Sequence, residues 1–290
     1  MQIVRFESNG KPRLGIRDGS EIVDIGVGRS DIPTDLSEAL RLGAAAMEAI
    51  RDAARNAPSA ARRPAGEVRL LPPAATPGKV ICLGLNYVDH AAEAGRTKPD
   101  YPIVFFRGAS SFVGDGAPLV RPVCSDQLDY EGELVAFVGK RARHVPREQA
   151  HAVIAGYSVF NDASVRDYQT RTSQWTVGKN FDGTGAFGPA FVSAEALPPG
   201  AAGLKIETRL NGKAVQSANT ADMVFDVAET VALLSQCMTL EPGDLLVMGT
   251  PGGVGAARKP QLFMRPGDVC EVEIEGIGLL SNPVVQESRP

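Results

Sequence analysis

The first 70 residues combine short apolar runs with one longer stretch of helical periodicity. Residues 2–6, 13–17 and 22–25 are such runs, separated by Asn-Gly and Asp-Gly pairs, which favour turns between antiparallel strands. Apolar side chains in residues 35–55 recur at helical spacing, which predicts one helix. Residues 56–66 then break the pattern with prolines and a glycine, and we expect a linker there.

Beyond this linker, short apolar runs dominate. They predict strands at residues 79–85, 133–138, 154–160, 204–210, 245–248 and 269–274. Helical spacing predicts helices at residues 87–94 and 224–237. The strands do not alternate regularly with long helices, which disfavours a doubly wound parallel sheet. We therefore predict an α+β fold that is mostly β, with a small N-terminal α/β domain (residues 1–70) and a larger domain (residues 71–290).

Charge and composition exclude several kinds of partner. The net charge is −4 and no cluster of Lys or Arg stands out, whereas nucleic-acid binding needs a basic surface. No apolar run approaches the ~20 residues of a membrane-spanning helix, and the N-terminus does not resemble a signal peptide. The cysteines are scattered and form no Cys-x-x-Cys pair, as in reducing compartments. We expect a cytoplasmic protein with no membrane or nucleic-acid partner.

Three carboxylates lie in two strongly apolar segments. Glu131 and Glu133 flank Gly132, and Asp162 ends the run 156–162. Positions i and i+2 of a strand face the same way, so the two glutamates lie side by side and need a compensating cation or proton. An all-oxygen ligand set indicates Mg²⁺, Mn²⁺ or Ca²⁺ rather than zinc. The alternative is a solvent-facing Glu pair with Asp162 capping a helix.

Other polar residues fit the same site. Asp162, Arg166 and Gln169 are spaced i, i+4 and i+7, so a helix beginning near Asp162 would present all three on one face. Lys179, in a glycine-rich stretch without the Walker spacing, would offset excess negative charge if it faced the metal. Thr250 lies in a glycine-rich loop whose hydroxyl and N–H groups would receive a carboxylate.

His90 and Glu93 provide a candidate base. On a helical turn they are neighbours, so Glu93 would bond one imidazole nitrogen and leave the other free to take a proton. The alternative is an incidental pair on a surface helix. His144 and His151 lie in polar, Arg-rich surroundings and look like surface residues.

In this order the segments resemble the fumarylacetoacetate hydrolase superfamily, from about residue 78 to residue 285, and in particular its acylpyruvase or fumarylpyruvate hydrolase-like branch. The motifs that carry the resemblance are Asn86-Tyr87-x-x-His90-x-x-Glu93, Glu131-x-Glu133, Asn161-Asp162-x-Ser164-x-Arg166-Asp167-x-Gln169, Lys179 and Gly249-Thr250-Pro251-x-Gly253-Val254-Gly255. Two positions depart from the family pattern. Arg107 stands where a lysine is usual, and Gly183 where threonine is frequent.

The resemblance implies a mixed β-roll catalytic domain behind a small N-terminal domain, assembled as a homodimer. It implies Mg²⁺ or Mn²⁺ held by Glu131, Glu133 and Asp162, and a small 2-oxo acid as the substrate. An arginine at position 107 would grip a substrate carboxylate bidentately. With Gln169 and Thr250, Arg107 is therefore expected to bind the substrate's ends.

The reaction expected from these motifs is hydrolysis of an acylpyruvate, such as fumarylpyruvate, to pyruvate and a carboxylic acid. His90, oriented by Glu93, would activate water, and Lys179 would stabilise the enolate that leaves. Three alternatives stay open. They are decarboxylation of oxaloacetate, isomerisation or hydration of a 2-hydroxyhepta-2,4-diene-1,7-dioate-type acid, and binding of a 2-oxo acid without turnover.

Overall fold

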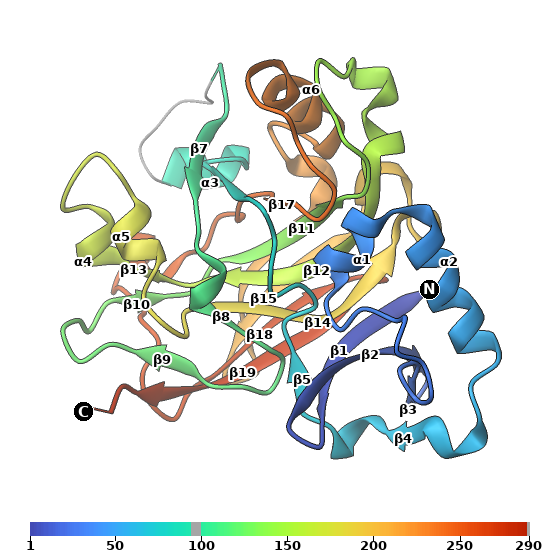
Figure 1. The fold of residues 1–290 in the computed structure, drawn as a ribbon. Coiled ribbons are helices and arrows are strands. Elements are labelled where there is room, and N and C mark those ends of the chain that lie inside the picture. Colours follow the sequence, from blue (N-terminus) through green and yellow to red (C-terminus); the bar gives the residue numbers. More distant parts are fainter. Residues whose placement is uncertain (94–99, 289–290) are drawn as a thin grey trace.

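The computed structural model describes residues 1–93 and 100–288, and one long twisted sheet organises them (Figure 1). Its strands are β1 (Gln2–Ser8), β2 (Lys11–Asp18), β3 (Glu21–Asp24), β4 (Arg62–Pro64), β5 (Leu70–Leu71), β6 (Val80–Gly84), β7 (Ile103–Phe106), β8 (Phe112–Val113), β11 (Gly132–Val138), β12 (Ile154–Asp162), β14 (Gly185–Ser193) and β17 (Leu245–Val247). Their order is β4-β3-β2-β1-β14-β12-β11-β17-β6-β7, with β5 beside β1 and β8 beside β14.

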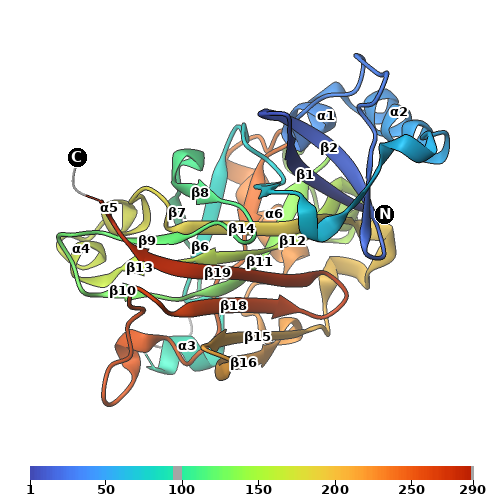
Figure 2. The same cartoon turned by 90° about the horizontal axis from the view of Figure 1, so that it is seen from below.

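A second sheet lies against the centre of the first (Figure 2). Its order is β16 (Lys213–Asn219), β15 (Lys205–Leu210), β18 (Val269–Ile274), β19 (Gly278–Gln286) and β9 (Leu119–Arg121). A separate short pair joins β10 (Leu128–Asp129) to β13 (Ser164–Val165). Leu134, Ile206 and Val272 are buried in a core shared by both sheets, and burial of such side chains is a main driving force for folding. The prediction of a mostly β, α+β fold is confirmed.

The α-helices are α1 (Leu36–Leu42), α2 (Ala44–Arg55), α3 (Val88–Glu93), α4 (Arg166–Gln169), α5 (Thr176–Lys179) and α6 (Val227–Cys237). Shorter 3₁₀ helices are η1 (Ser59–Ala61), η2 (Ala65–Glu67), η3 (Ala109–Ser111), η4 (Arg147–Val153), η5 (Ala194–Ala196), η6 (Pro199–Ala201), η7 (Thr220–Asp222) and η8 (Gly255–Ala257). The single helix predicted for residues 35–55 is wrong. Gly43 adopts φ 83° and separates α1 from α2, a conformation that glycine tolerates best.

The predicted linker is also more structured than expected. Residues 62–64 form β4, which pairs with β3, so only part of the segment 56–66 is a connection. Strand β1 pairs with β14 through Ile3 and Phe191, which joins the N-terminal unit to the rest of the chain by a continuous sheet. The domain boundary near residue 70 stays a prediction.

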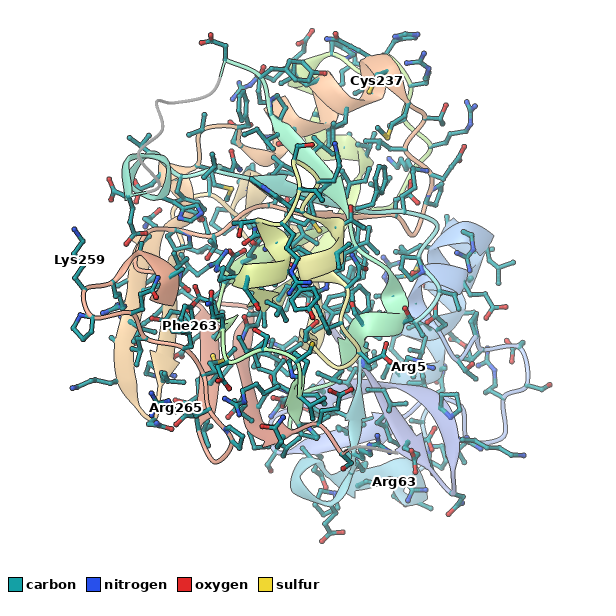
Figure 3. All side chains as sticks on the ribbon, turned by 90° about the vertical axis from the view of Figure 1, so that its left-hand side faces the viewer. Arg5, Arg63, Cys237, Lys259, Phe263 and Arg265 are labelled. Atoms are coloured by element: carbon teal, nitrogen blue, oxygen red, sulfur yellow. The ribbon has the colours of Figure 1, made fainter. Side chains whose placement is uncertain are left out.

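The cysteines and the helices bear on the expectations from the sequence. Figure 3 shows Arg5 and Arg63 in the N-terminal unit, with Cys237 near the end of α6. The cysteines are unpaired, Cys82 and Cys270 being buried and the other two exposed. Within residues 1–93 and 100–288 no helix has the length and apolar character needed to cross a membrane.

Candidate active site

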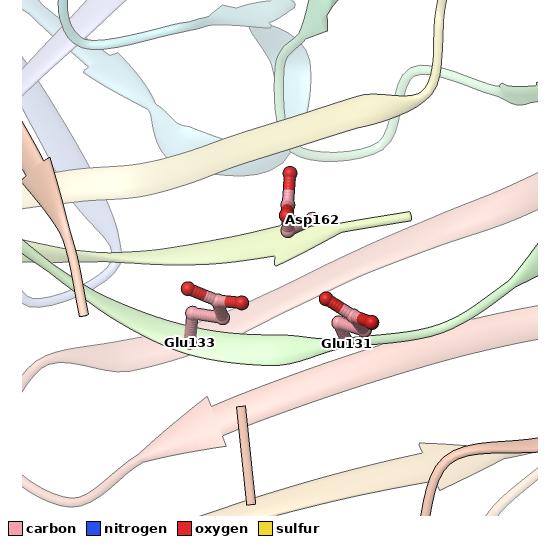
Figure 4. A group of neighbouring side chains, drawn as sticks. All are labelled: Glu131, Glu133 and Asp162. Carbon is pink, nitrogen blue, oxygen red and sulfur yellow. The ribbon is translucent and has the colours of Figure 1, made fainter. Parts of the chain in front are cut away.

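The three predicted carboxylates meet on one face of the long sheet. Strands β11 and β12 are antiparallel with Gly132 opposite Asn161, and the N–H of Asp162 donates to the carbonyl of Glu131 at 2.8 Å. Opposed residues of antiparallel strands project to the same face, so Asp162 lies beside Glu131 and Glu133 (Figure 4). One carboxylate oxygen of each lies within 4.8 Å of the others, and all three residues are buried.

The backbone between the two glutamates is fixed by the second sheet. A Cβ atom at Gly132 would lie 2.3 Å from Thr208 Oγ1 and 2.9 Å from Val272 Cγ1, so the close packing of the two sheets requires a glycine here. Gln216 Oε1 accepts the N–H of Gly132 at 3.0 Å. Asn161 Oδ1 accepts the N–H of Glu131 at 2.9 Å. These contacts hold the carboxylates in register.

Two cations balance part of the negative charge. Lys179 Nζ lies 2.6 Å from both Glu131 Oε2 and Asp162 Oδ2, and Arg166 Nη1 lies 2.6 Å from Glu131 Oε1. Burial alone would raise the pKa of Glu131, but the charges of Lys179 and Arg166 outweigh it and lower that pKa to about 2. Burial would lower the pKa of Lys179, but Asp162 and Glu131 raise it. The side chain of Lys179 is therefore protonated and positively charged.

Glu133 has no such cation. Its Oε2 accepts the N–H of Gly249 at 2.6 Å, and among the described residues no ion pair reaches its carboxylate. Burial, followed by the charges of Asp162 and Glu131, raises the pKa of Glu133 well above its usual range. A divalent cation would relieve this repulsion. The donor set is oxygen only, which suits a hard ion and fits the expected metal.

Asp129 is a site residue that the sequence reasoning missed. Its carboxylate accepts a hydrogen bond from Arg166 Nε at 2.8 Å and one from each of the backbone N–H groups of Gly255 and Ala256, also at 2.8 Å. It thereby fixes both the guanidinium and the loop after Thr250. One signal was present, because Asp129 precedes Glu131 by two residues and so continues the alternation of acids.

The expected helix through Asp162 is wrong in part. Asp162 ends strand β12, and α4 begins only at Arg166. Arg166 still reaches the site through its ion pair with Glu131, and it holds Gln169 beside it because Arg166 Nη1 donates to Gln169 Oε1 at 2.8 Å. That bond leaves the amide nitrogen of Gln169 available to the cavity. Arg166 Nη2 is buried and has no hydrogen-bond partner among the described residues.

Arg107 does not line the cavity, contrary to the expectation that it grips the substrate. Its guanidinium is buried behind Asp162, to which Nη1 donates. Nε donates to Ser111 Oγ at 2.9 Å, and Nη2 to Thr184 Oγ1 at 2.6 Å. Because every nitrogen has a partner, Arg107 orients a carboxylate of the protein itself.

His90 and Glu93 come together at the rim of the cavity on α3. His90 Nδ1 lies 3.7 Å from Glu93 Oε2, longer than a hydrogen bond, and it has no hydrogen-bond partner among the described residues. Glu93 accepts the N–H of Gly253 at 2.9 Å. At the start of the segment, Asn86 is buried and its amide donates to the carbonyl of Met248 at 2.7 Å.

A cavity of about 510 Å³ connects these groups, a size typical of small-molecule sites. Its lining includes His90, Glu93, Glu131, Glu133, Arg166, Gln169, Lys179 and Thr250. Thr250 Oγ1 donates to the carbonyl of Gly132 at 3.0 Å and accepts Gln216 Nε2 at 2.8 Å. The hydroxyl proton of Thr250 is therefore engaged by the carbonyl of Gly132. Thr250 both lines the cavity and fixes the first residue of β11.

Several known proteins are similar to this chain. The family model "Fumarylacetoacetate (FAA) hydrolase C-terminal" matches residues 79–285. The oxaloacetate tautomerase fahd2, mitochondrial, of Xenopus laevis is 38% identical over 98% of this chain and 90% of its own. A fumarylacetoacetate hydrolase from Exiguobacterium antarcticum has a TM-score of 0.86 and 37% identity, covering 99% of this chain and 100% of its own.

A third similar protein was solved with ligands. The maleylpyruvate hydrolase from Sphingobium sp. SYK-6, in complex with manganese(II) and pyruvate, has a TM-score of 0.82 and 29% identity. The similarity covers 99% of this chain and 100% of that chain. Matching the family model over most of its length, and carrying the buried acidic site that its sequence predicted, the chain belongs to the fumarylacetoacetate hydrolase family.

Proposed function

We propose that this protein is a metal-dependent enzyme that moves a proton on a small 2-oxo acid, and that enol–keto tautomerisation of a dicarboxylic acid such as oxaloacetate is its principal reaction. The observation that carries the proposal is a single imidazole, His90, in the same cavity as a buried carboxylate site. Similarity to a named oxaloacetate tautomerase over 98% of the chain supports this reaction above the hydrolysis expected from the motifs.

Glu131, Glu133 and Asp162 would hold Mg²⁺ or Mn²⁺. When bound, the metal supplies a Lewis acid that stabilises negative charge on the 2-oxo oxygen. Gln169 lines the cavity, and its amide nitrogen is available to the substrate's oxygens. Arg166 lines the same cavity, but its Nη2 is buried and has no hydrogen-bond partner among the described residues. The hydroxyl of Thr250 is already bonded, so its contact with the substrate would be as an acceptor.

Tautomerisation moves one proton. In the enol-to-keto direction a proton leaves the C2 hydroxyl and a proton is added at C3. His90 lines the cavity with Nδ1 turned toward Glu93, so its other ring nitrogen, Nε2, is the one that would carry the proton. Burial alone would raise the pKa of Glu93, but His90 and the N–H of Gly253 outweigh it and lower that pKa. Glu93 is therefore an anion that stabilises the imidazolium. Lys179 would stabilise charge on the substrate during the transfer.

Hydrolytic cleavage of an acylpyruvate is the second candidate. The specific observation in its favour is the similar maleylpyruvate hydrolase, which was solved with manganese and pyruvate. The same His90–Glu93 pair could activate water instead of moving a substrate proton. Decarboxylation of oxaloacetate also begins from a 2-oxo acid, and the assay below separates it from the other two reactions. Isomerisation of a dienoate begins from the enol of such an acid and is tested by offering that substrate.

The deciding experiment mixes purified protein and Mg²⁺ with enol-oxaloacetate and, separately, with acylpyruvates. The enol is followed by ultraviolet absorbance and the products by NMR. Tautomerisation predicts faster loss of the enol than in buffer, with no more carbon dioxide or pyruvate than buffer with Mg²⁺ alone gives. Pyruvate with carbon dioxide would indicate a decarboxylase, and pyruvate with a free acid a hydrolase. Glu133→Gln is the inactive control, and unchanged substrates would overturn the enzyme assignment. The expected homodimer stays a prediction, which sedimentation would test.

A further inference from the structure

Part of the cavity lining is aliphatic and aromatic. Leu83, Gly84 and Leu85, at the end of β6, line it with Phe105 of β7 and Trp175 from the loop before α5. Trp175 is the single tryptophan of the chain. The residues just before it, 171–174, are exposed, so the indole separates the interior of the cavity from a solvent-facing loop.

The position of the indole is tightly defined. A Cβ atom at position 84 would lie 2.1 Å from Trp175 Cζ3 and 2.7 Å from Cη2, so only a glycine at position 84 lets the ring pack this closely on the backbone of β6. The ring also meets Phe105 edge to face, with centroids 5.6 Å apart, a favourable aromatic geometry. Lys179 Nζ lies 5.2 Å from the centroid of Phe105. The aromatic wall therefore begins next to the carboxylates.

The part of the wall that comes from β6 and the proposed base belong to one stretch of chain. Gly84 ends β6, and His90 follows on α3. A substrate whose 2-oxo acid end lies on the carboxylates presents its reacting carbon to His90. The group beyond that carbon would then lie among the apolar lining residues, which share the cavity with His90. Among these, Trp175 packs on Gly84 more closely than a side chain at position 84 would allow.

We propose that Trp175, packed on Gly84 and Phe105, forms the subsite for the substrate group beyond the carbon that His90 reaches, and that the indole sets the largest group accepted. The inference rests on the proposed function, because it assumes a 2-oxo acid reacting beside His90. It narrows the substrate class to 2-oxo acids with a short distal group. A bulky aromatic acyl group would collide with the ring.

The first test compares kcat/KM for oxaloacetate with kcat/KM for an aromatic acylpyruvate, benzoylpyruvate. Trp175→Ala is expected to raise the ratio in favour of benzoylpyruvate by ~10-fold or more, because one methylene in an apolar pocket already changes specificity 10- to 200-fold. Trp175→Phe should fall between. Val177→Ala, at an exposed position close by, is the matched control and should leave the ratio unchanged. An unchanged ratio in an active Trp175→Ala enzyme overturns the proposal.

The second test does not depend on turnover. Because Trp175 is the chain's one tryptophan, its fluorescence reports ligand binding in the presence of Mg²⁺. Oxaloacetate is expected to change the emission of the wild type and to bind more tightly than benzoylpyruvate. Gly84→Ala should displace the indole, shift its emission and weaken that discrimination, and it provides a second variant if Trp175→Ala fails to fold.

The two proposals fail in different ways. An emission change with oxaloacetate but no turnover of any acid overturns the proposed function and supports the subsite. Turnover without any emission change in the wild type overturns the subsite and leaves the function intact. A thermal shift that shows binding, with neither turnover nor an emission change, overturns both. If no acid binds at all, both are overturned.

Discussion

Two parts of the cavity are built differently. The floor consists of the carboxylates Glu131, Glu133 and Asp162, and the rim consists of His90 and Glu93 on α3. Glu131 and Asp162 are buried and share Lys179 at 2.6 Å. His90 and Glu93 are partly exposed and stand 3.7 Å apart. Glu93 is held by an N–H of a glycine-rich loop, whereas the floor is held by two stacked sheets.

This difference in construction indicates that the floor and the rim have different roles. A charged site formed inside a core must be organised before the ligand arrives, because unpaired buried charges are costly. A base at the rim can adjust when the substrate binds, and geometry observed without a ligand is often looser than in the reacting complex. We infer that the floor fixes the class of chemistry and that the rim tunes its rate.

Removing the metal should have the largest effect. Chelation with EDTA is expected to abolish turnover, and Mg²⁺ or Mn²⁺ should restore it, because three buried carboxylates then regain their counter-charge. Metal should also raise the unfolding temperature as its concentration increases. Glu133→Gln should prevent the recovery, whereas Glu148→Gln, at an exposed position, should not. Full activity in EDTA would show that Lys179 and Arg166 suffice without a metal.

Removing the base should have the next largest effect. His90→Ala is expected to lower kcat by ~10²–10⁴, the usual contribution of a general acid–base group. Because His90 is not part of the floor, metal affinity, measured by thermal shift with Mn²⁺, should stay unchanged. His151→Gln, at an exposed histidine, serves as the control. Near-wild-type turnover would remove His90 from the mechanism.

Replacing Arg107 tests how far its contact with Asp162 supports the carboxylate site. Arg107→Lys keeps the charge but loses the donors to Ser111 and Thr184, which an ammonium cannot replace in the same geometry. Metal affinity or activity should fall ~10- to 100-fold, as for other groups that orient a metal ligand, and the unfolding temperature should fall as well. Arg141→Lys, at an exposed ion pair, should change neither.

The alternative outcome is equally informative. If Arg107→Lys raises KM alone, with metal affinity and stability unchanged, the guanidinium contacts the substrate as its sequence position first suggested. The structure predicts the opposite, because Arg107 is buried and lies outside the cavity lining.

The floor could be predicted from the sequence because its information is local. Alternation on a strand places Glu131 beside Glu133, and a second apolar strand ending in Asp162 supplies the third ligand. The supports of the floor could not be predicted in this way. Gln216 and Thr208 come from the other sheet, and no spacing along the chain indicates that the two sheets meet at Gly132.

The errors have the same origin. The i, i+4, i+7 spacing of Asp162, Arg166 and Gln169 suggested one helix. A strand that ends at Asp162 and is followed by a short helix has the same spacing along the chain, so the spacing alone does not distinguish the two. A guanidinium pairs equally well with a substrate carboxylate or a protein carboxylate, so the role of Arg107 depends on which side of Asp162 it occupies. In the N-terminal unit, the break at Gly43 depends on a positive φ that helical periodicity does not reveal.

Neutralising Glu93 should have the smallest effect and should sharpen the comparison most. Glu93→Gln keeps an oxygen for the N–H of Gly253 but removes the charge near His90. A partly exposed pair is worth ~0.2–1 kcal/mol, so kcat should fall only ~1.4- to 5-fold. Glu93→Ala also frees the N–H of Gly253 and should cost more. If Glu93→Gln were as damaging as His90→Ala, the pair must close to a tight hydrogen bond during turnover, and the rim would then be as ordered as the floor once the substrate is bound.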